Sequence, residues 1–252
     1  MENHSYDQVV GYSGAPYENS LIDKCGLATN YHGITHPSLP NYIAATGGTT
    51  AGISSDCAPS SSCQSTGQSI FEQVASRGGW RSYEESMPAN CSPTSSGEYA
   101  VKHNPAPYYT RVRSQCAKWD VPFGSASRGR FISDVDNGRL PAFSFVTPNL
   151  CNDTHDCSVP TGDSWLHTVV THLTSSATYR AGRTAIFITW DEGYDNANHV
   201  PTIVVAPTVS PHLRSSISFS HYSLLRTAEE MLHLSLLGDA QYAASMRDPF
   251  GL

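Results

Sequence analysis

The chain has 252 residues with a formal net charge of -7, an apolar fraction of 39% and a charged fraction of 15%. This composition excludes a disordered protein, and the length allows one large domain or two small ones; we expect a single domain over residues 1–252. Without a cluster of Lys and Arg a nucleic-acid partner is not expected, whereas an anionic substrate can still bind where a metal and histidines reverse the local potential. No apolar run is long enough for stable membrane insertion.

The first half of the chain predicts helices that alternate with loops. Residues 17–28 have helical character, and Leu39–Thr46 predicts a helix that follows a Pro-bounded turn. Gln68–Arg77 predicts an amphipathic helix closed by two glycines, and Trp80–Glu84 a short strand. The segment 86–125 is rich in proline and aromatics, which indicates an irregular insertion that lines a site and stays outside the core.

The second half predicts strands separated by helices. The expected elements are a strand at Ala142–Thr147, a helix at Asp163–Ser175, strands at Thr184–Trp190 and Thr202–Ala206, and a helix at Tyr222–Leu234. This alternation predicts an α/β fold with a largely parallel central sheet flanked by helices on both sides. Ligands of such folds bind at the carboxyl ends of the strands.

Two features of the sequence suggest a catalytic or metal-binding role, and the first of them lies at the carboxyl end of a predicted strand. Asp191 and Glu192 follow a strongly apolar strand, and two adjacent carboxylates there are costly unless a cation compensates them. A solvated turn explains this pair equally well. Ser38 precedes a predicted helix, whose free N–H groups and dipole favour a phosphoryl group, although an ordinary N-cap is the simpler interpretation. No Gly-x-Ser-x-Gly elbow surrounds Ser38, which disfavours an α/β-hydrolase triad.

The loop at 149–163 is the next candidate. It holds Asp153, His155 and Asp156 behind a predicted strand, and a polar loop that needs rigidity is typical of a site. A turn rich in Asp and Asn is the equally good alternative. His199, before the strand at 202–206, is weak evidence by itself.

Seven cysteines form close pairs along the sequence. Cys57 and Cys63 bracket one loop, Cys151 and Cys157 bracket another, Cys91 and Cys116 flank a longer stretch, and Cys25 is left over. No pair has the spacing of a zinc knuckle, so we favour disulfides and an oxidising compartment over free thiols or zinc.

Five segments in order carry a family resemblance: 1–7, 35–42, 149–166, 190–192 and 221–225. They resemble the phosphoesterase family that includes bacterial acid phosphatases and the phospholipases C of the alkaline-phosphatase-like superfamily. The resemblance extends from Met1 to about Leu237 and is strongest to the short secreted acid phosphatases, some of which act on phosphoinositides.

The resemblance implies roles for particular residues. Ser38 would be the nucleophile and also a ligand of one divalent metal ion of unknown identity, and a second ion held through His155 and His221 is left open. The remaining metal ligands would be Glu2, Asn3, Asp191 and Glu192. His155 and His103 would contact the phosphoryl group or protonate the leaving group, and the weaker phosphate contacts would be Lys102, Asp156, His199 and His221.

The resemblance also implies an activity: metal-dependent hydrolysis of phosphate monoesters through a phosphoserine, on a small phosphorylated substrate or a phospholipid headgroup. A phosphodiesterase of the phospholipase C type is one alternative, and a non-catalytic phosphate-ligand binding protein is another. Family members carry a strand and usually an export signal before the Glu-Asn pair. We therefore expect a secreted protein, and a sequence that is truncated and lacks the first strand of the sheet.

Overall fold

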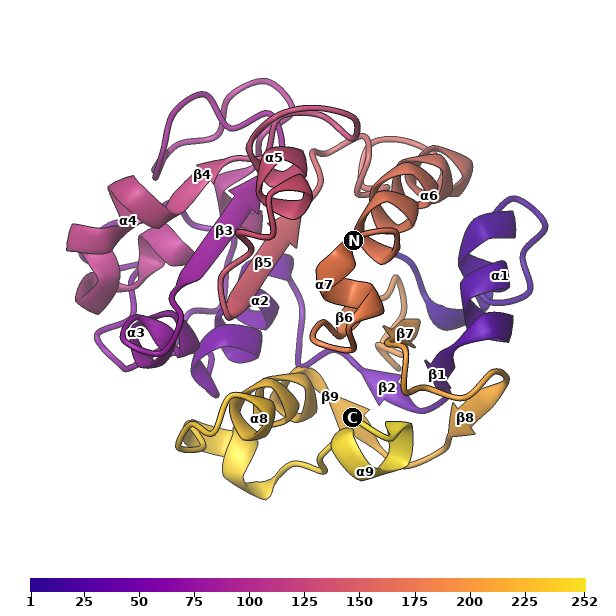
Figure 1. Cartoon of the computed structure of the whole chain (residues 1–252). Coiled ribbons are helices and arrows are strands. Elements are labelled where there is room, and N and C mark those ends of the chain that lie inside the picture. Colours follow the sequence, from indigo (N-terminus) through magenta and orange to yellow (C-terminus); the bar gives the residue numbers. More distant parts are fainter.

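The structure is a computed structural model that describes residues 1–252 (Figure 1). Its α-helices are α1 (Pro16–Lys24), α2 (Ser38–Gly47), α3 (Ile70–Val74), α4 (Arg113–Trp119), α5 (Arg130–Asp136), α6 (Val159–Thr174), α7 (Ala177–Arg180), α8 (His221–Met231) and α9 (Arg247–Phe250). Its strands are β1 (Gly26–Ala28), β2 (Tyr31–His32), β3 (Trp80–Glu84), β4 (Asp120–Pro122), β5 (Phe143–Thr147), β6 (Ile186–Thr189), β7 (Thr202–Val205), β8 (Leu213–Ser215) and β9 (Phe219–Ser220). None of the helices combines the length and the apolarity that crossing a bilayer requires.

The strands form three sheets. β4, β3 and β5 pair in parallel in that order, and β2 pairs in parallel with β9. The four-stranded sheet has the order β6-β7-β1-β8, in which β7 is antiparallel to both of its neighbours. The predicted α/β class is confirmed, with the difference that the strands divide among separate sheets and that one of these is mixed.

Strand β3 shows how helices cover both faces of a sheet. Alternate residues of a strand point to opposite faces. Trp80 lies against Phe71 of α3, with ring centroids 4.8 Å apart, in one hydrophobic cluster. Tyr83 meets Phe131 of α5 edge to face at 5.1 Å in the other cluster. The sheet is therefore a buried layer between two sets of helices, as predicted.

The segment 86–125 differs from its prediction. It contains three 3-10 turns (Val101–His103, Ala106–Tyr108 and Thr110–Val112), helix α4 and strand β4. Its side chains belong to the core, since Tyr99, Tyr108, Tyr109 and Cys116 are at most 2% exposed. Short turns give no hydrophobic period, so the sequence pattern could not show that these aromatics face inward.

The boundaries of two helices also differ from their predictions. The segment 17–28 is helical only to Lys24, and β1 starts at Gly26, where a Cβ would stand 2.6 Å from the ring of Phe250. Helix α6 starts at Val159, four residues earlier than expected, because Pro160 is tolerated in a first helical turn.

The cysteines pair as predicted. Disulfides join Cys57 with Cys63, Cys91 with Cys116 and Cys151 with Cys157, and Cys25 is a buried free thiol.

The N-terminal residues run alongside β6. The N-terminal ammonium of Met1 donates to Thr189 O at 3.1 Å, and Asp191 N donates to Met1 O at 3.2 Å, which is the pattern of a parallel ladder. Glu2 N donates to Asp153 O at 2.7 Å. These bonds hold Glu2 beside Asp191 and beside the loop that follows β5.

Glu18 of α1 gives a prediction about stability and pH. Its side chain is fully buried, neither carboxyl oxygen has a hydrogen-bond partner, and burial, followed by the nearby Asp163 carboxylate, raises its pKa to about 8. Because folding raises the pKa of Glu18, the folded state is favoured most at a pH below the pKa of the unfolded state, where the carboxyl is protonated in both states. This contribution to stability is lost as the pH rises from there to about 8, the pKa of the folded state.

We expect Glu18→Gln to raise the free energy of unfolding by roughly 4 kcal/mol at pH 8.5 and to leave it nearly unchanged at pH 4.5. Thermal melts of both proteins at the two pH values measure the difference. An equal effect at both pH values would contradict the assignment of a buried, proton-holding Glu18.

Candidate active site

Ser38 lies between carboxylates that come from distant parts of the chain. Its hydroxyl is at the start of α2, 3.2 Å from Oε2 of Glu2 and 3.2 Å from Oε1 of Glu192, and the residue is 1% exposed. Asn3 Nδ2 donates to the same Oε1 of Glu192 at 3.0 Å. The structure therefore brings together four residues that the sequence predicted as metal ligands.

Four carboxylates are buried around this serine: Glu2, Asp153, Asp191 and Glu192, none more than 6% exposed. Burial, then the charges of Asp191 and Asp153, raises the pKa of Glu2 well above its usual range. Burial, then Glu192, raises the pKa of Asp191 to about 8. So much negative charge in one buried place is unfavourable without a cation.

Several oxygens of this cluster lack any donor. Asn3 Oδ1 and both carboxyl oxygens of Asp191 are buried without a hydrogen-bond partner. Buried acceptors are normally satisfied, so each unpaired oxygen calls for an explanation. Carboxylate, amide and hydroxyl oxygens are the ligands that hard divalent cations prefer. The donor set therefore fits the predicted metal ion.

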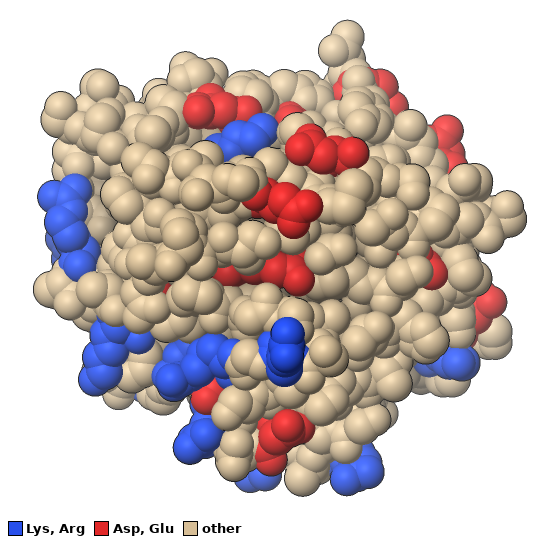
Figure 2. Space-filling view, turned by 90° about the horizontal axis from the view of Figure 1, so that it is seen from above, with Lys and Arg blue, Asp and Glu red and all other residues tan.

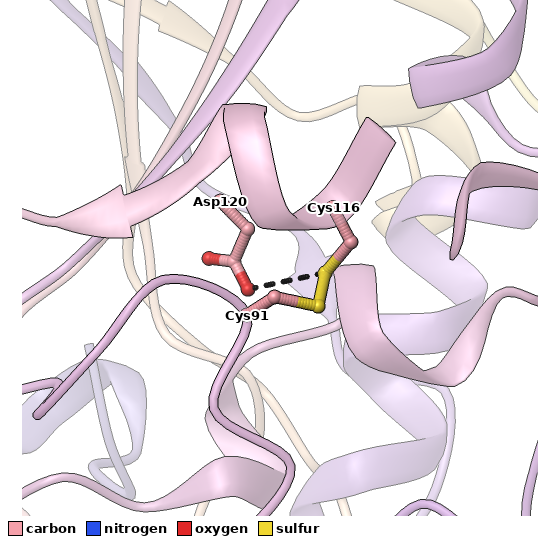
Figure 3. Close-up of side chains that lie close together, drawn as sticks. All are labelled: Cys91, Cys116 and Asp120. Carbon is pink, nitrogen blue, oxygen red and sulfur yellow. Dashed lines mark hydrogen bonds between the residues drawn. A yellow bond between two sulfur atoms is a disulfide. The ribbon is translucent and has the colours of Figure 1, made fainter. Parts of the chain in front are cut away.

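A second group of possible ligands is not a metal site. Cys91, Cys116 and Asp120 bring three ligand atoms within 4.8 Å of one another (Figure 3), whereas no three carboxylate or histidine ligand atoms from different residues of the Ser38 cluster lie that close together. The two sulfurs share a disulfide and offer no thiolate. Oδ2 of Asp120 accepts a hydrogen bond from Asn104 at 2.8 Å. Cys91, Cys116 and Asp120 are therefore a disulfide next to a buried carboxyl group, and they do not form a metal site.

His103 connects two of the buried carboxylates. Its Nε2 lies 3.3 Å from Oε1 of Glu2, and its Nδ1 lies 3.3 Å from Oδ2 of Asp153. The ring is 2% exposed and stacks on Tyr42, whose hydroxyl donates to Glu2. Burial lowers the pKa of His103 to about 4, so the ring is neutral at pH 7.

His155 lies at the outer side of the cluster. Its side chain is 31% exposed, its Nδ1 is 2.6 Å from Oδ1 of Asp156, and its ring centroid is 5.8 Å from that of His103. Its backbone N–H donates to Oδ1 of Asp153 at 2.8 Å. An imidazole held by a carboxylate on one nitrogen is oriented, with the other nitrogen available for a substrate.

Lys102 is engaged near the start of α2. Its Nζ donates to Oδ2 of Asp56 at 3.1 Å, and Oδ1 of Asp56 accepts from Leu39 N at 3.0 Å. The N–H group of Leu39 therefore donates to the Asp56 carboxylate, although the sequence predicted that the free N–H groups of this helix would bind a phosphoryl group.

The two weaker histidines have structural partners. Nε2 of His221 lies 2.6 Å from the carbonyl oxygen of Asp191, and Nδ1 lies 3.0 Å from the hydroxyl of Tyr31, so both ring nitrogens are engaged next to the cluster. His199 stacks on Tyr6 at 4.3 Å and has its Nε2 3.1 Å from Thr29 O. The structure does not bring His199 to the carboxylates, because these two contacts hold its ring elsewhere.

Sequence reasoning missed Tyr42 and His36, which touch the cluster, and named Asp153 within a candidate loop without giving it a role. Tyr42 follows Ser38 by one helical turn, which places both on one face of α2. Nδ1 of His36 lies 2.5 Å from Oε2 of Glu192, and Asp153 contacts His103. The helical spacing was a usable signal for Tyr42; nothing in the sequence pairs His36 with Glu192.

The carboxyl ends of β3 and β5 point upward in Figure 1 and face the viewer in Figure 2. On this face acidic side chains gather near the centre, and basic ones lie mostly along the lower and left rim. A cation in the centre of such a face would be attracted by the surrounding charge.

Comparisons with known proteins identify the family of the chain. The model of the Phosphoesterase family matches residues 5–235. A phosphatidylinositol-3-phosphatase of Mycobacterium tuberculosis is 31% identical over 99% of this chain and 80% of its own length. An acid phosphatase of Aspergillus fumigatus is 27% identical over 94% of this chain, which spans 54% of that protein, so only about half of its length is matched.

Solved structures show the same fold. A protein in the alkaline phosphatase superfamily from Vibrio parahaemolyticus matches with a TM-score of 0.65 and 11% identity, over 99% of this chain and 70% of that one. Identity this low supports the fold alone, whereas the family match covers most of the sequence. The chain thus belongs to the Phosphoesterase family, has the fold of the alkaline phosphatase superfamily and is a phosphoric ester hydrolase.

Proposed function

We propose that this protein hydrolyses phosphate monoesters through a phosphoserine on Ser38. The observation that carries the proposal is the position of the Ser38 hydroxyl, 3.2 Å from two buried carboxylates whose neighbours include unpaired oxygens. The hydroxyl hydrogen is directed at a carboxylate, so lone pairs of the oxygen remain for phosphorus.

We propose that Glu2, Asn3, Ser38, Asp191 and Glu192 hold one divalent ion. Such an ion supplies positive charge that stabilises the serine oxygen and the phosphoryl oxygens. The bond from Ser38 Oγ to phosphorus forms as the bond from phosphorus to the ester oxygen breaks, and the hydroxyl proton passes to one of the two carboxylates that it faces, Glu2 or Glu192. Water then attacks the phosphoserine, which releases inorganic phosphate and restores the hydroxyl.

His155 is the proposed acid that protonates the leaving oxygen. It is more exposed than His103, which burial keeps neutral at pH 7. His103 is proposed to hold Asp153 in place through Nδ1, while its Nε2 faces Glu2. The other three predicted phosphate contacts are proposed to position neighbouring groups. Lys102 contacts Asp56, Asp156 contacts His155, and His221 contacts the carbonyl group of Asp191.

The leaving group distinguishes an acid from a binding residue. We expect His155→Asn to lower kcat for β-glycerol phosphate by about 10²–10³, and kcat for p-nitrophenyl phosphate by less than about tenfold, because p-nitrophenolate leaves without a proton. His172→Asn is the matched control, since His172 is similarly exposed and also pairs with an aspartate, at 2.8 Å. An equal loss with both substrates would reject His155 as the acid.

The proposed substrate is a monoester of a hydroxyl-rich alcohol, such as a phosphoinositide headgroup. An open depression of about 630 Å³ adjoins the loop of Asp153 through Asn152. Most of the residues that line it are polar: Glu85, Ser125, Ala126, Ser127, Asn152, Pro160, Thr161, Ser164 and Trp165. Hydroxyl and amide groups there suit a polyol, and the mycobacterial relative is a phosphatidylinositol-3-phosphatase.

Comparing p-nitrophenyl phosphate with p-nitrophenyl phosphorylcholine separates this proposal from its alternatives. Turnover of the monoester alone supports a phosphatase, and preferred turnover of the diester supports the phospholipase C alternative. Binding without turnover of either would favour a phosphate-ligand binding protein. The three disulfides further support the proposal that the protein works in an oxidising, extracellular compartment.

A further inference from the structure

A basic pocket is lined by residues of β3, of α5 and of the segment that follows α5, and it shares no residue with the Ser38 cluster. Figure 1 labels both elements. It encloses about 180 Å³, several times the roughly 30 Å³ that one water takes in the liquid. Its lining contains no apolar side chain and consists of Arg81, Arg130, Ser133, Asp134 and Arg139. Three guanidiniums, always protonated, face one carboxylate, which gives a local excess of positive charge in a chain with a net charge of -7.

The Asp134 carboxylate holds Arg81 and Arg130 by hydrogen bonds, and Arg139 lies nearby. Oδ2 of Asp134 accepts from Arg81 Nη1 at 2.6 Å, from Tyr83 OH at 2.9 Å and from Arg130 Nε at 2.9 Å, and the Asp134 side chain is 1% exposed. Arg139 Nε lies 3.9 Å from the other carboxyl oxygen. Oδ2 of this single carboxylate accepts from three donors and so orients Arg81 and Arg130, and one negative charge cannot neutralise three cations.

Arg81 is the most constrained of the three. Its side chain is 9% exposed, and its guanidinium lies 5.3 Å from the ring centre of Trp119 and 5.8 Å from that of Tyr83. Its Nε is buried without a partner, and neither its Nη2 nor the two Nη atoms of Arg130 has a protein acceptor. Unpaired donors fixed around a polar cavity match the oxygens of a tetrahedral anion.

We propose that this pocket binds a phosphate group at a site separate from the catalytic centre. The ligand chemistry is a phosphate oxyanion held by the Nη atoms of Arg81, Arg130 and Arg139, with Ser133 as a further polar contact. A free phosphate ion and the phosphodiester of a phospholipid headgroup share this chemistry, and the experiment distinguishes them.

The test uses the double variant Arg130→Gln/Arg139→Gln, which removes the two exposed guanidiniums, 52% and 63% exposed, and leaves the buried Arg81 in place. The control is Arg113→Gln/Arg180→Gln, which makes the same charge change at exposed positions outside the pocket. Calorimetric titration with inorganic phosphate should find two classes of site in wild type and in the control. The pocket variant should bind at least about tenfold more weakly at one class and keep its kcat/KM for p-nitrophenyl phosphate.

Sedimentation with phosphatidylcholine vesicles, with and without phosphatidylinositol, identifies the source of the phosphate. Pocket-dependent sedimentation assigns the site to a lipid headgroup, and phosphate binding without sedimentation assigns it to a soluble phosphate. Two unchanged classes in the pocket variant, or a single class in wild type, would overturn the proposal. Thermal melts and the single variant Arg139→Gln ensure that a loss of binding is not a loss of folding.

Discussion

Replacing Ser38 with alanine is expected to lower kcat for p-nitrophenyl phosphate by about 10⁴-fold or more, because no other hydroxyl is held between Glu2 and Glu192 to attack phosphorus. Substrate binding should change far less, since the carboxylates, His103 and His155 remain. Steady-state kinetics measure the loss. Acid quenching of wild type during turnover should trap one phosphoryl group on the peptide that contains Ser38, and the variant should trap none.

The matched control is Ser176→Ala. Ser176 also stands at a helix N-terminus, where its oxygen accepts from Tyr179 N at 3.2 Å, but it is remote in sequence from every predicted ligand. Its loss should cost about 1 kcal/mol of stability and no activity. Substantial turnover by Ser38→Ala, with a melting temperature close to that of wild type, would remove Ser38 as nucleophile and with it the phosphoserine mechanism.

Much of the fold could be predicted because its pattern is local. Trp80–Glu84 is a strand at the predicted residues, and the apolar run at 184–190 contains β6. The pairing of strands could not be predicted in the same way. β7 is antiparallel to β6 and β1 through contacts between residues far apart in sequence, which no short pattern encodes.

The residues of the candidate site also differ in whether a local sequence pattern could identify them. Asp191 and Glu192 were candidates from local physics, since two carboxylates after a buried strand need compensation, although a solvated turn explained them equally well. Glu2 and Asn3 had no local signal and came from the family resemblance, yet they meet Ser38 and Glu192 in the structure. His199 shows the opposite case, because its place in the sequence suggested a phosphate contact, whereas stacking on Tyr6 accounts for its ring.

Asp191→Asn should change stability in opposite directions with and without metal. In metal-free protein at pH 8.5 the variant should melt at a higher temperature than wild type, because a neutral amide replaces a buried carboxyl whose pKa is raised to about 8. Below about pH 4 both side chains are uncharged, so the advantage should disappear. With a divalent ion in excess the order should reverse, since binding to the folded state stabilises wild type more.

The same variant should lose at least about 10²-fold in metal affinity and in kcat, because residues that merely support metal ligands already cost 10–100-fold when they are replaced. Mg²⁺, Mn²⁺, Zn²⁺ and Ca²⁺, added one at a time to chelator-treated protein, identify the ion through the rise in melting temperature and the bound metal content. Asp136→Asn, which removes an exposed carboxylate at the end of α5, should leave both readouts unchanged. If no ion gives wild type and Asp191→Asn different melting temperatures or metal contents, the unpaired oxygens around Ser38 are not a metal site. Asp191 would then be compensated by a bound proton, as its raised pKa allows.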